Sequence, residues 1–152
     1  MKKKFKVFFI CMCVLLSMVG CNAKVNKSMS YTYSVDTGDK IKLTLDTSDN
    51  YKLTSEVPFS ILKDEETLSQ GQFITAENYS QYVDVVNSDE KATLIDSGNK
   101  DGNEYIFWSY NDSEYNYAIL ITDSETGVII GNPVSEESAK ECFERIDISK
   151  AD

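Results

Sequence analysis

The chain contains no histidine. This absence excludes Ser-His-Asp and Cys-His catalytic sites, and it excludes any metal site with imidazole ligands. Cysteine is also scarce: Cys11 and Cys13 lie in an apolar N-terminal segment, Cys21 follows that segment, and only Cys142 lies further along. A single thiol in the body of the chain cannot form an intrachain disulfide, so we expect a hydrophobic core alone to stabilise the fold.

The apolar run at the N-terminus is too short to cross a membrane. It covers residues 7–19 and is interrupted only by Ser17, whereas a spanning helix needs about 20 residues. Residues 1–6 before it are basic, and Gly20 follows it. A basic start, an apolar middle and a small residue at the end are the parts of a secretory signal peptide, so residues 1–20 are predicted to be removed.

The end of this segment, Val19-Gly20-Cys21, resembles the lipobox of bacterial lipoproteins, in which a small residue precedes a cysteine. Met18 departs from the leucine that is usual there. The resemblance implies that a diacylglyceryl group is attached to the Cys21 thiol and that the chain is cut before it. Residues 21–30 are then a polar, lipidated tether, and the protein is expected on the extracytoplasmic face of the cell membrane, with the membrane as a partner through this lipid.

Basic residues are few in what remains. The 15 Lys and Arg fall to 11 once Lys2, Lys3, Lys4 and Lys6 are removed, against 25 Asp and Glu, which gives a net charge of −14. Such a chain lacks the cations that bind phosphate groups, so we expect no nucleic acid partner. Anionic lipid headgroups should repel it as well, which leaves the acyl chains to hold it at the membrane.

Residues 31–149 are predicted to form a single α+β domain. Apolar and polar residues alternate from Ile41 through Leu43 to Leu45, which is typical of a half-buried strand. Other segments with strand character are residues 51–53, 59–62, 68–74, 92–96, 105–110, 115–122, 128–130 and 146–148. Asn, Asp and Gly in the intervening turns favour hairpins, so the sheet should be mainly antiparallel.

Two helices are predicted to pack on this sheet. Residues 75–87 place Tyr79, Tyr82, Val83 and Val86 on one helical face, with Thr75 as a cap. The second helix follows a capping serine, Ser135, and its apolar stripe consists of Ala139, Cys142, Phe143 and Ile146. On this stripe Cys142 is expected to be a buried structural thiol, so no catalytic residue is assigned.

The three-strand meander from Tyr105 to Ile130, the helix after Ser135 and the Phe-Glu-Arg-Ile-Asp-Ile tail at 143–148 resemble the Mog1/PsbP-like α/β/α sandwich of many small bacterial lipoproteins. That family includes adaptor and assembly proteins without catalysis. The resemblance therefore implies a binding or accessory role rather than a particular ligand.

Aromatic residues of the meander suggest a binding surface. Alternate residues of a strand share a face, so Trp108 and Tyr110 should point the same way, with Tyr115 or Tyr117 beside them. Exposed, these rings would form a surface for a sugar, a peptide or a protein. The alternative is that the terminal helix covers this face.

Oxygen-bearing side chains gather in one predicted turn: Asp96, Asn99, Asp101, Asn103 and Glu104. Calcium prefers such ligands, but their spacing does not match the twelve-residue calcium loop. A hairpin turn that uses these residues for their backbone angles is the favoured interpretation, and no metal or other cofactor is predicted.

The sequence thus predicts a lipid-anchored protein that binds or assists an envelope protein or a small extracellular ligand without catalysis. Two alternatives stay open: an enzyme that acts on envelope or extracellular substrates through carboxylates, and a purely structural surface protein.

Overall fold

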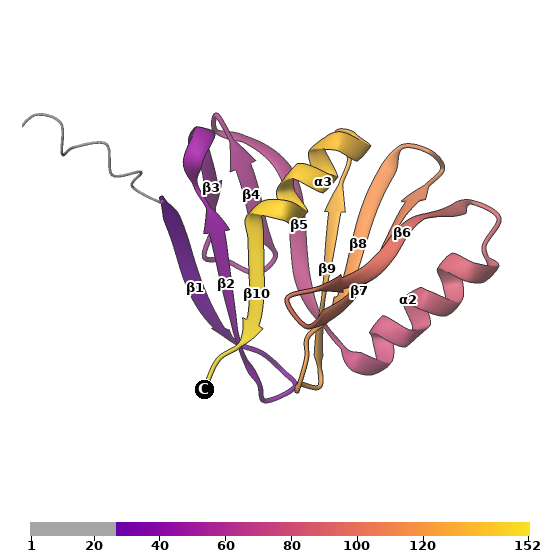
Figure 1. Cartoon of the computed structure of the whole chain (residues 1–152), viewed down its shortest axis with the longest axis horizontal. Helices are drawn as coiled ribbons and strands as arrows, with labels where there is room; N and C mark the ends of the chain where they lie inside the picture. Colours follow the sequence, from indigo (N-terminus) through magenta and orange to yellow (C-terminus); the bar gives the residue numbers. More distant parts are fainter. Residues whose placement is uncertain (1–26) are drawn as a thin grey trace, which may run out of the picture.

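The computed structural model describes residues 27–152 (Figure 1). The predicted signal peptide and Cys21 lie outside these residues. The described elements follow in the order β1 (Ser28–Ser34), β2 (Lys40–Asp46), the 3-10 turn η1 (Ser48–Asn50), β3 (Tyr51–Leu53), β4 (Phe59–Lys63), β5 (Glu66–Thr75), α2 (Ala76–Ser88), β6 (Ala92–Lys100), β7 (Asn103–Tyr110), β8 (Glu114–Leu120), β9 (Thr126–Asn132), α3 (Glu136–Arg145) and β10 (Ile146–Lys150).

The strands form two separate sheets. A three-stranded sheet, here the small sheet, has the order β1-β2-β10. A seven-stranded sheet, here the large sheet, has the order β3-β4-β5-β9-β8-β7-β6. Every pair in both sheets is antiparallel, which confirms the predicted α+β class with a mainly antiparallel arrangement.

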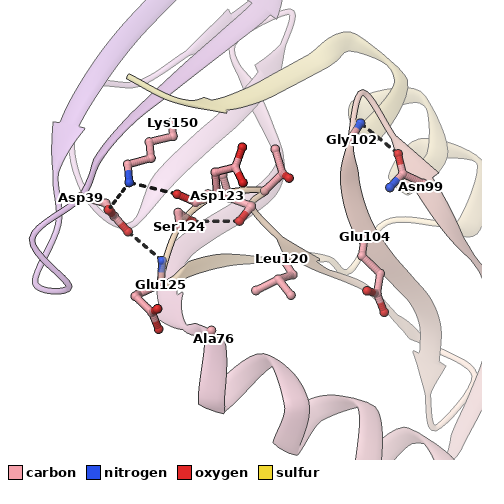
Figure 2. Close-up of a pocket in the computed structure, with 12 residues that line it drawn as sticks. Asp39, Ala76, Asn99, Gly102, Glu104, Leu120, Asp123, Ser124, Glu125 and Lys150 are labelled. Carbon is pink, nitrogen blue, oxygen red and sulfur yellow. Dashed lines mark hydrogen bonds and ion pairs between the residues drawn. The ribbon is translucent and has the colours of Figure 1, made fainter. Parts of the chain in front are cut away.

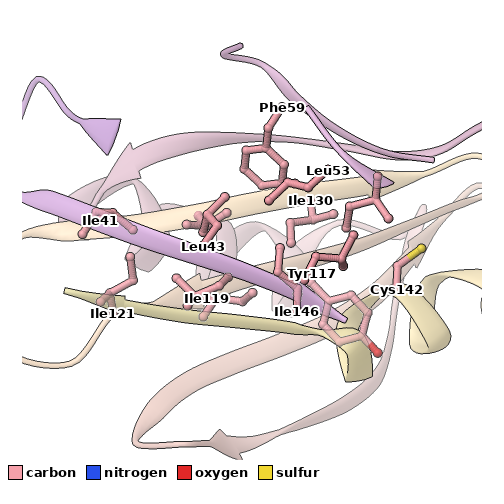
Figure 3. Packing of buried hydrophobic residues seen from close by; sticks show 14 of the residues in the cluster. Ile41, Leu43, Leu53, Phe59, Tyr117, Ile119, Ile121, Ile130, Cys142 and Ile146 are labelled. Atoms are coloured by element: carbon pink, nitrogen blue, oxygen red, sulfur yellow. The ribbon is translucent and has the colours of Figure 1, made fainter. Parts of the chain in front are cut away.

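The alternating pattern of β2 explains why the small sheet packs on the large one. Ile41, Leu43 and Leu45 are fully buried, while Lys42 between them is exposed. Figure 3 shows Leu43 lying in the core together with Ile119 of β8 and other buried side chains of the same cluster. One face of the large sheet is therefore covered by the small sheet and by α3, and we call it the closed face.

The other face of the large sheet is covered by α2 alone, and we call it the open face (Figure 1). Tyr79 and Val86 of α2 pack there against Ile106, Trp108 and Ala118 of the sheet. The predicted stripe of α2 is thus confirmed as its packing side.

Both helices begin at the predicted caps. The hydroxyl of Thr75 accepts a hydrogen bond from the amide of Asn78 (3.1 Å), and that of Ser135 accepts one from the amide of Ser138 (3.0 Å). Each bond satisfies a donor that the first turn of a helix leaves free.

The side chain of Lys100, at the end of β6, binds the backbone where α3 ends and β10 begins. Its Nζ donates to the carbonyl oxygens of Phe143 (2.6 Å), Glu144 (3.3 Å) and Ile146 (2.6 Å). A cation is favourable there because the carbonyls at the end of a helix carry partial negative charge. Asn103 Nδ2 donates in the same way to the carbonyl of Ile148 in β10 (2.7 Å), so side chains of the β6–β7 hairpin cover this edge of the small sheet.

The structure corrects two expectations from the sequence, one about a boundary and one about the sheet. Strand β1 begins at Ser28, inside the segment predicted as tether, because its residues pair with β2 from Ser28↔Asp46 onward. The strands also divide between two sheets, since β2 and β10 pair with each other and not with the meander. None of the helices in residues 27–152 is long and apolar enough to span a membrane.

Candidate binding face

Trp108 lies beneath helix α2. Only 5% of its surface is exposed, and its ring is 5.8 Å from that of Tyr82, centroid to centroid. The expectation that this indole forms part of an exposed surface is wrong. The alternative, that a helix covers this face, is correct, but the covering helix is α2 and not the terminal helix.

Tyr117 points the opposite way from Trp108. Its cross-strand partner is Phe107, and its ring is stacked between those of Phe107 (4.1 Å) and Phe143 (4.0 Å) on the closed face. Burial raises the pKa of the Tyr117 hydroxyl well above its ordinary value. Tyr110 and Tyr115 are half-buried and lie on opposite faces, because Tyr110 shares the side of Trp108 and Tyr115 that of Tyr117. The four residues do not form the single surface predicted.

The open face is incompletely covered, and a partly apolar hollow of about 450 Å³ lies between α2 and the edge strand β6. Val83 and Val86 line it from the helix, and Leu94 and Ile106 line it from the sheet. Leu94 remains 46% exposed, so it presents apolar surface to solvent. Exposed apolar surface inside a hollow is characteristic of binding sites.

A second hollow, of about 590 Å³, lies near the N-terminal end of α2 (Figure 2). Glu104 borders both hollows, and we call the two together the α2 groove. The second part is acidic: Asp39, Glu104, Asp123 and Glu125 line it, with Lys150 as the basic residue among the lining side chains that the structure describes.

The wall of the acidic part is fixed by Asp39 in the loop between β1 and β2. Its carboxylate accepts hydrogen bonds from Thr126 Oγ1 (2.8 Å) and the Glu125 amide (3.0 Å), and it pairs with Lys150 Nζ (3.2 Å). These interactions, that of Thr126 above all, hold the pKa of Asp39 below its ordinary value. Asp39 is thus a charged clamp that joins the two sheets at this end.

Glu104 is fixed less tightly, by one buried partner. The hydroxyl of Tyr79 in α2 donates to Glu104 Oε1 (3.3 Å). Burial, and then the charge of Glu104, raise the pKa of Tyr79 to about 12, so this hydroxyl stays protonated as the donor at neutral pH. The exposed Glu104 carboxylate is therefore oriented beside both hollows of the groove and keeps an oxygen available to solvent.

On its other side α2 borders a smaller hollow of about 270 Å³. Pro58, Gln72, Tyr82 and Gly131 line it, and Gln72 is exposed. The open face therefore offers accessible concave surface on both sides of the helix.

The oxygen-rich turn forms the hairpin between β6 and β7. Asp101 and Gly102 have φ angles of 54° and 90°, which suit a tight turn between antiparallel strands. Asn103 is buried, with Oδ1 accepting from the Thr122 amide and Nδ2 donating to Ile148, while Asp96 Oδ2 accepts from the Tyr105 hydroxyl. In residues 27–152 no group of three or more acidic or cysteine side chains is arranged to hold a metal ion.

Cys142 is buried at 1% exposure on α3, as its position on the apolar stripe predicts. Burial raises the pKa of its thiol, which disfavours the reactive thiolate. The structure places this residue in the core, and it lines none of the three hollows.

No protein-family model and no curated protein matches the chain. Residues 27–152 form a small α+β fold with antiparallel sheets and two helices.

The α2 groove was not predicted from the sequence. Its walls come from segments distant along the chain, among them β6, β7, α2, β10, the β1–β2 loop and the β8–β9 turn, and no local pattern relates these segments. Leu94 offered a weak signal, since it is a large apolar residue in a strand whose other residues are mostly polar.

Proposed function

We propose that the protein is a bacterial lipoprotein anchored through Cys21 on the extracytoplasmic face of the cell membrane, with a non-catalytic binding or accessory role for an envelope protein. The basic, apolar and Gly-Cys segments before residue 22 support the anchor. The layered α+β architecture supports a Mog1/PsbP-like domain, whose members include adaptors. A small extracellular ligand is the other class of partner that the groove could take.

The observation that carries the binding role is the α2 groove on the open face. Ser28, where the domain begins, pairs with Asp46 at one end of the small sheet, while Asp39 and the acidic part of the groove lie at the other end. Six residues lie between Cys21 and Ser28, and a chain of this length reaches at most about 25 Å. A groove at the end away from this short tether faces out from the membrane, where an envelope partner can reach it.

The carboxylates of the groove are less suited to catalysis. An acid that protonates a leaving group needs a raised pKa, whereas the pKa of Asp39 is lowered and its oxygens are occupied by Thr126, Glu125 and Lys150. Binding therefore accounts for the groove better than carboxylate-dependent hydrolysis does.

Photo-crosslinking in the native membrane tests this proposal. A photoreactive amino acid replaces Leu94 or Gln72 on the open face, and in the control it replaces Lys42, which is exposed on the small sheet. We expect a defined crosslinked protein from an open-face position and none from Lys42. The Cys21→Ser variant should lose fatty-acid labelling, since it lacks the thiol that carries the lipid. Equal products from Lys42 would contradict the binding role, and fatty-acid labelling that persists in Cys21→Ser would contradict the anchor.

A further inference from the structure

Strand β6 leaves one edge of the large sheet without a partner strand among residues 27–152. It pairs with β7 only, and Thr93, Leu94, Ser97 and Gly98 are exposed. An edge strand offers unpaired backbone amide and carbonyl groups to an incoming chain. The edge of the small sheet at β10 differs, because the side chains of Lys100 and Asn103 bind its carbonyls.

The free edge lies directly beside the apolar part of the α2 groove. Leu94 belongs to β6 and also lines that hollow, opposite Val83 and Val86 of the helix. A chain that pairs with β6 would therefore place every second side chain over the groove. Backbone pairing and an apolar pocket together are the requirements of strand addition.

The charge around the edge determines which chain fits. Asp96 lies on β6 itself, where its Oδ1 accepts from the Ser97 amide (2.9 Å), and Glu104 lies at the end of the hollow. No basic side chain lines this hollow among the described residues. Residues 27–152 contain all 25 acidic residues of the chain, so a second copy would be repelled, whereas a basic segment would be attracted.

We propose that β6 accepts an extended, basic segment of a partner protein as an additional strand of the large sheet. An apolar side chain of that segment occupies the hollow between Leu94 and α2, and its alternate, basic side chains lie on the opposite side of the sheet, where Asp96 is paired across from Phe107. This inference rests on the proposed binding role and specifies how the partner is bound.

Hydrogen exchange on the full-length lipidated protein in detergent tests the mode of binding. The probe is a short peptide with blocked ends in which valine alternates with lysine. One matched control has glutamate in place of lysine, and another has N-methyl groups on its central amides, which prevents backbone pairing. We expect the lysine peptide alone to slow amide exchange in Ala92–Lys100.

Two substitutions of exposed apolar residues localise the effect. Leu94→Asp should weaken peptide binding about tenfold, since it removes the apolar contact in the hollow. Val134→Asp, at a residue 55% exposed outside the groove, should leave binding unchanged. Both positions are open to solvent, so neither variant should fail to fold.

Three results would overturn strand addition: no slowing in β6 with the lysine peptide, equal slowing by either control peptide, or slowing that rises with protein concentration alone, which would identify a second copy as the occupant. If crosslinks from Leu94 or Gln72 persist while β6 stays unprotected, the binding role stands and only this mode is excluded.

Discussion

The two faces of the large sheet differ in how completely they are covered. The small sheet and α3 close one face, where Phe59, Phe107 and Val128 have no exposed surface. Helix α2 alone covers the other, and hollows remain on both of its sides. Because the free energy of burial scales with the apolar area removed from water, the closed face contributes most of the stability. The open face can therefore keep accessible surface for a partner.

The edges of the two sheets also differ in how completely they are covered. At β10, Lys100 and Asn103 satisfy backbone carbonyls with side chains of the same chain. At β6, Asp96 binds the Ser97 amide, but no strand covers the edge in residues 27–152. A small acidic domain thus leaves accessible the edge that adjoins its groove.

Replacing a leucine by alanine should cost much more stability on the closed face than on the open face. Leu43→Ala, at a fully buried position between the sheets, should lower the free energy of unfolding by about 2–5 kcal/mol, because it removes apolar contacts and leaves a cavity. The matched control is Leu94→Ala on the open face, at a position 46% exposed, which should change it by less than about 0.5 kcal/mol.

Urea denaturation followed by circular dichroism measures both variants. If Leu94→Ala lowers the free energy of unfolding as much as Leu43→Ala does, the β6 edge is part of the core. The two faces would then not differ in how much they stabilise the fold.

Removing the cation that covers the β10 edge should have a smaller effect. Lys100→Met keeps the length of the side chain but leaves the carbonyls of Phe143 and Ile146 without their donor. We expect a loss of about 1–3 kcal/mol, the usual cost of an unsatisfied, partly buried acceptor. Lys91→Met, at an exposed lysine next to the other end of β6, is the control and should be near neutral in the same urea assay. If the two variants behave alike, Lys100 does not stabilise this edge.

Local patterns predicted the elements well. Alternation at Ile41, Leu43 and Leu45 predicted β2, and Thr75 and Ser135 are the caps of α2 and α3 as expected. These signals succeed because strand alternation and helix capping depend on neighbouring residues.

The arrangement of elements in space was harder to predict. Trp108 and Tyr117 both look like members of an aromatic surface, yet each is buried, one under α2 and the other under Phe143. Which face a helix covers depends on contacts between segments distant in sequence, and aromatic residues supply core and binding surfaces alike. The Asp39 clamp was missed for the same reason, since Thr126 and Lys150 lie far from it along the chain.

The Asp39 clamp, where the closed face meets the acidic end of the groove, should depend on pH. A carboxyl whose pKa is lower in the folded protein stabilises the fold above its unfolded pKa of about 3.9. That stabilisation is lost as the pH falls through the lower folded value. We expect Asp39→Asn to melt below the parent protein at pH 6, and the gap between them to narrow as the pH falls below about 4.

Melting temperatures from pH 6 downward measure this gap, and Asp36→Asn, at an exposed residue of the same loop, controls for the loss of one negative charge. A gap that stays constant with pH would show that Asp39 acts through the shape of its side chain and not through its charge. In that case packing, and not the ionic interactions of Asp39, would hold the acidic wall of the groove in place. The negative charge of Asp39 would then be free to attract a basic partner.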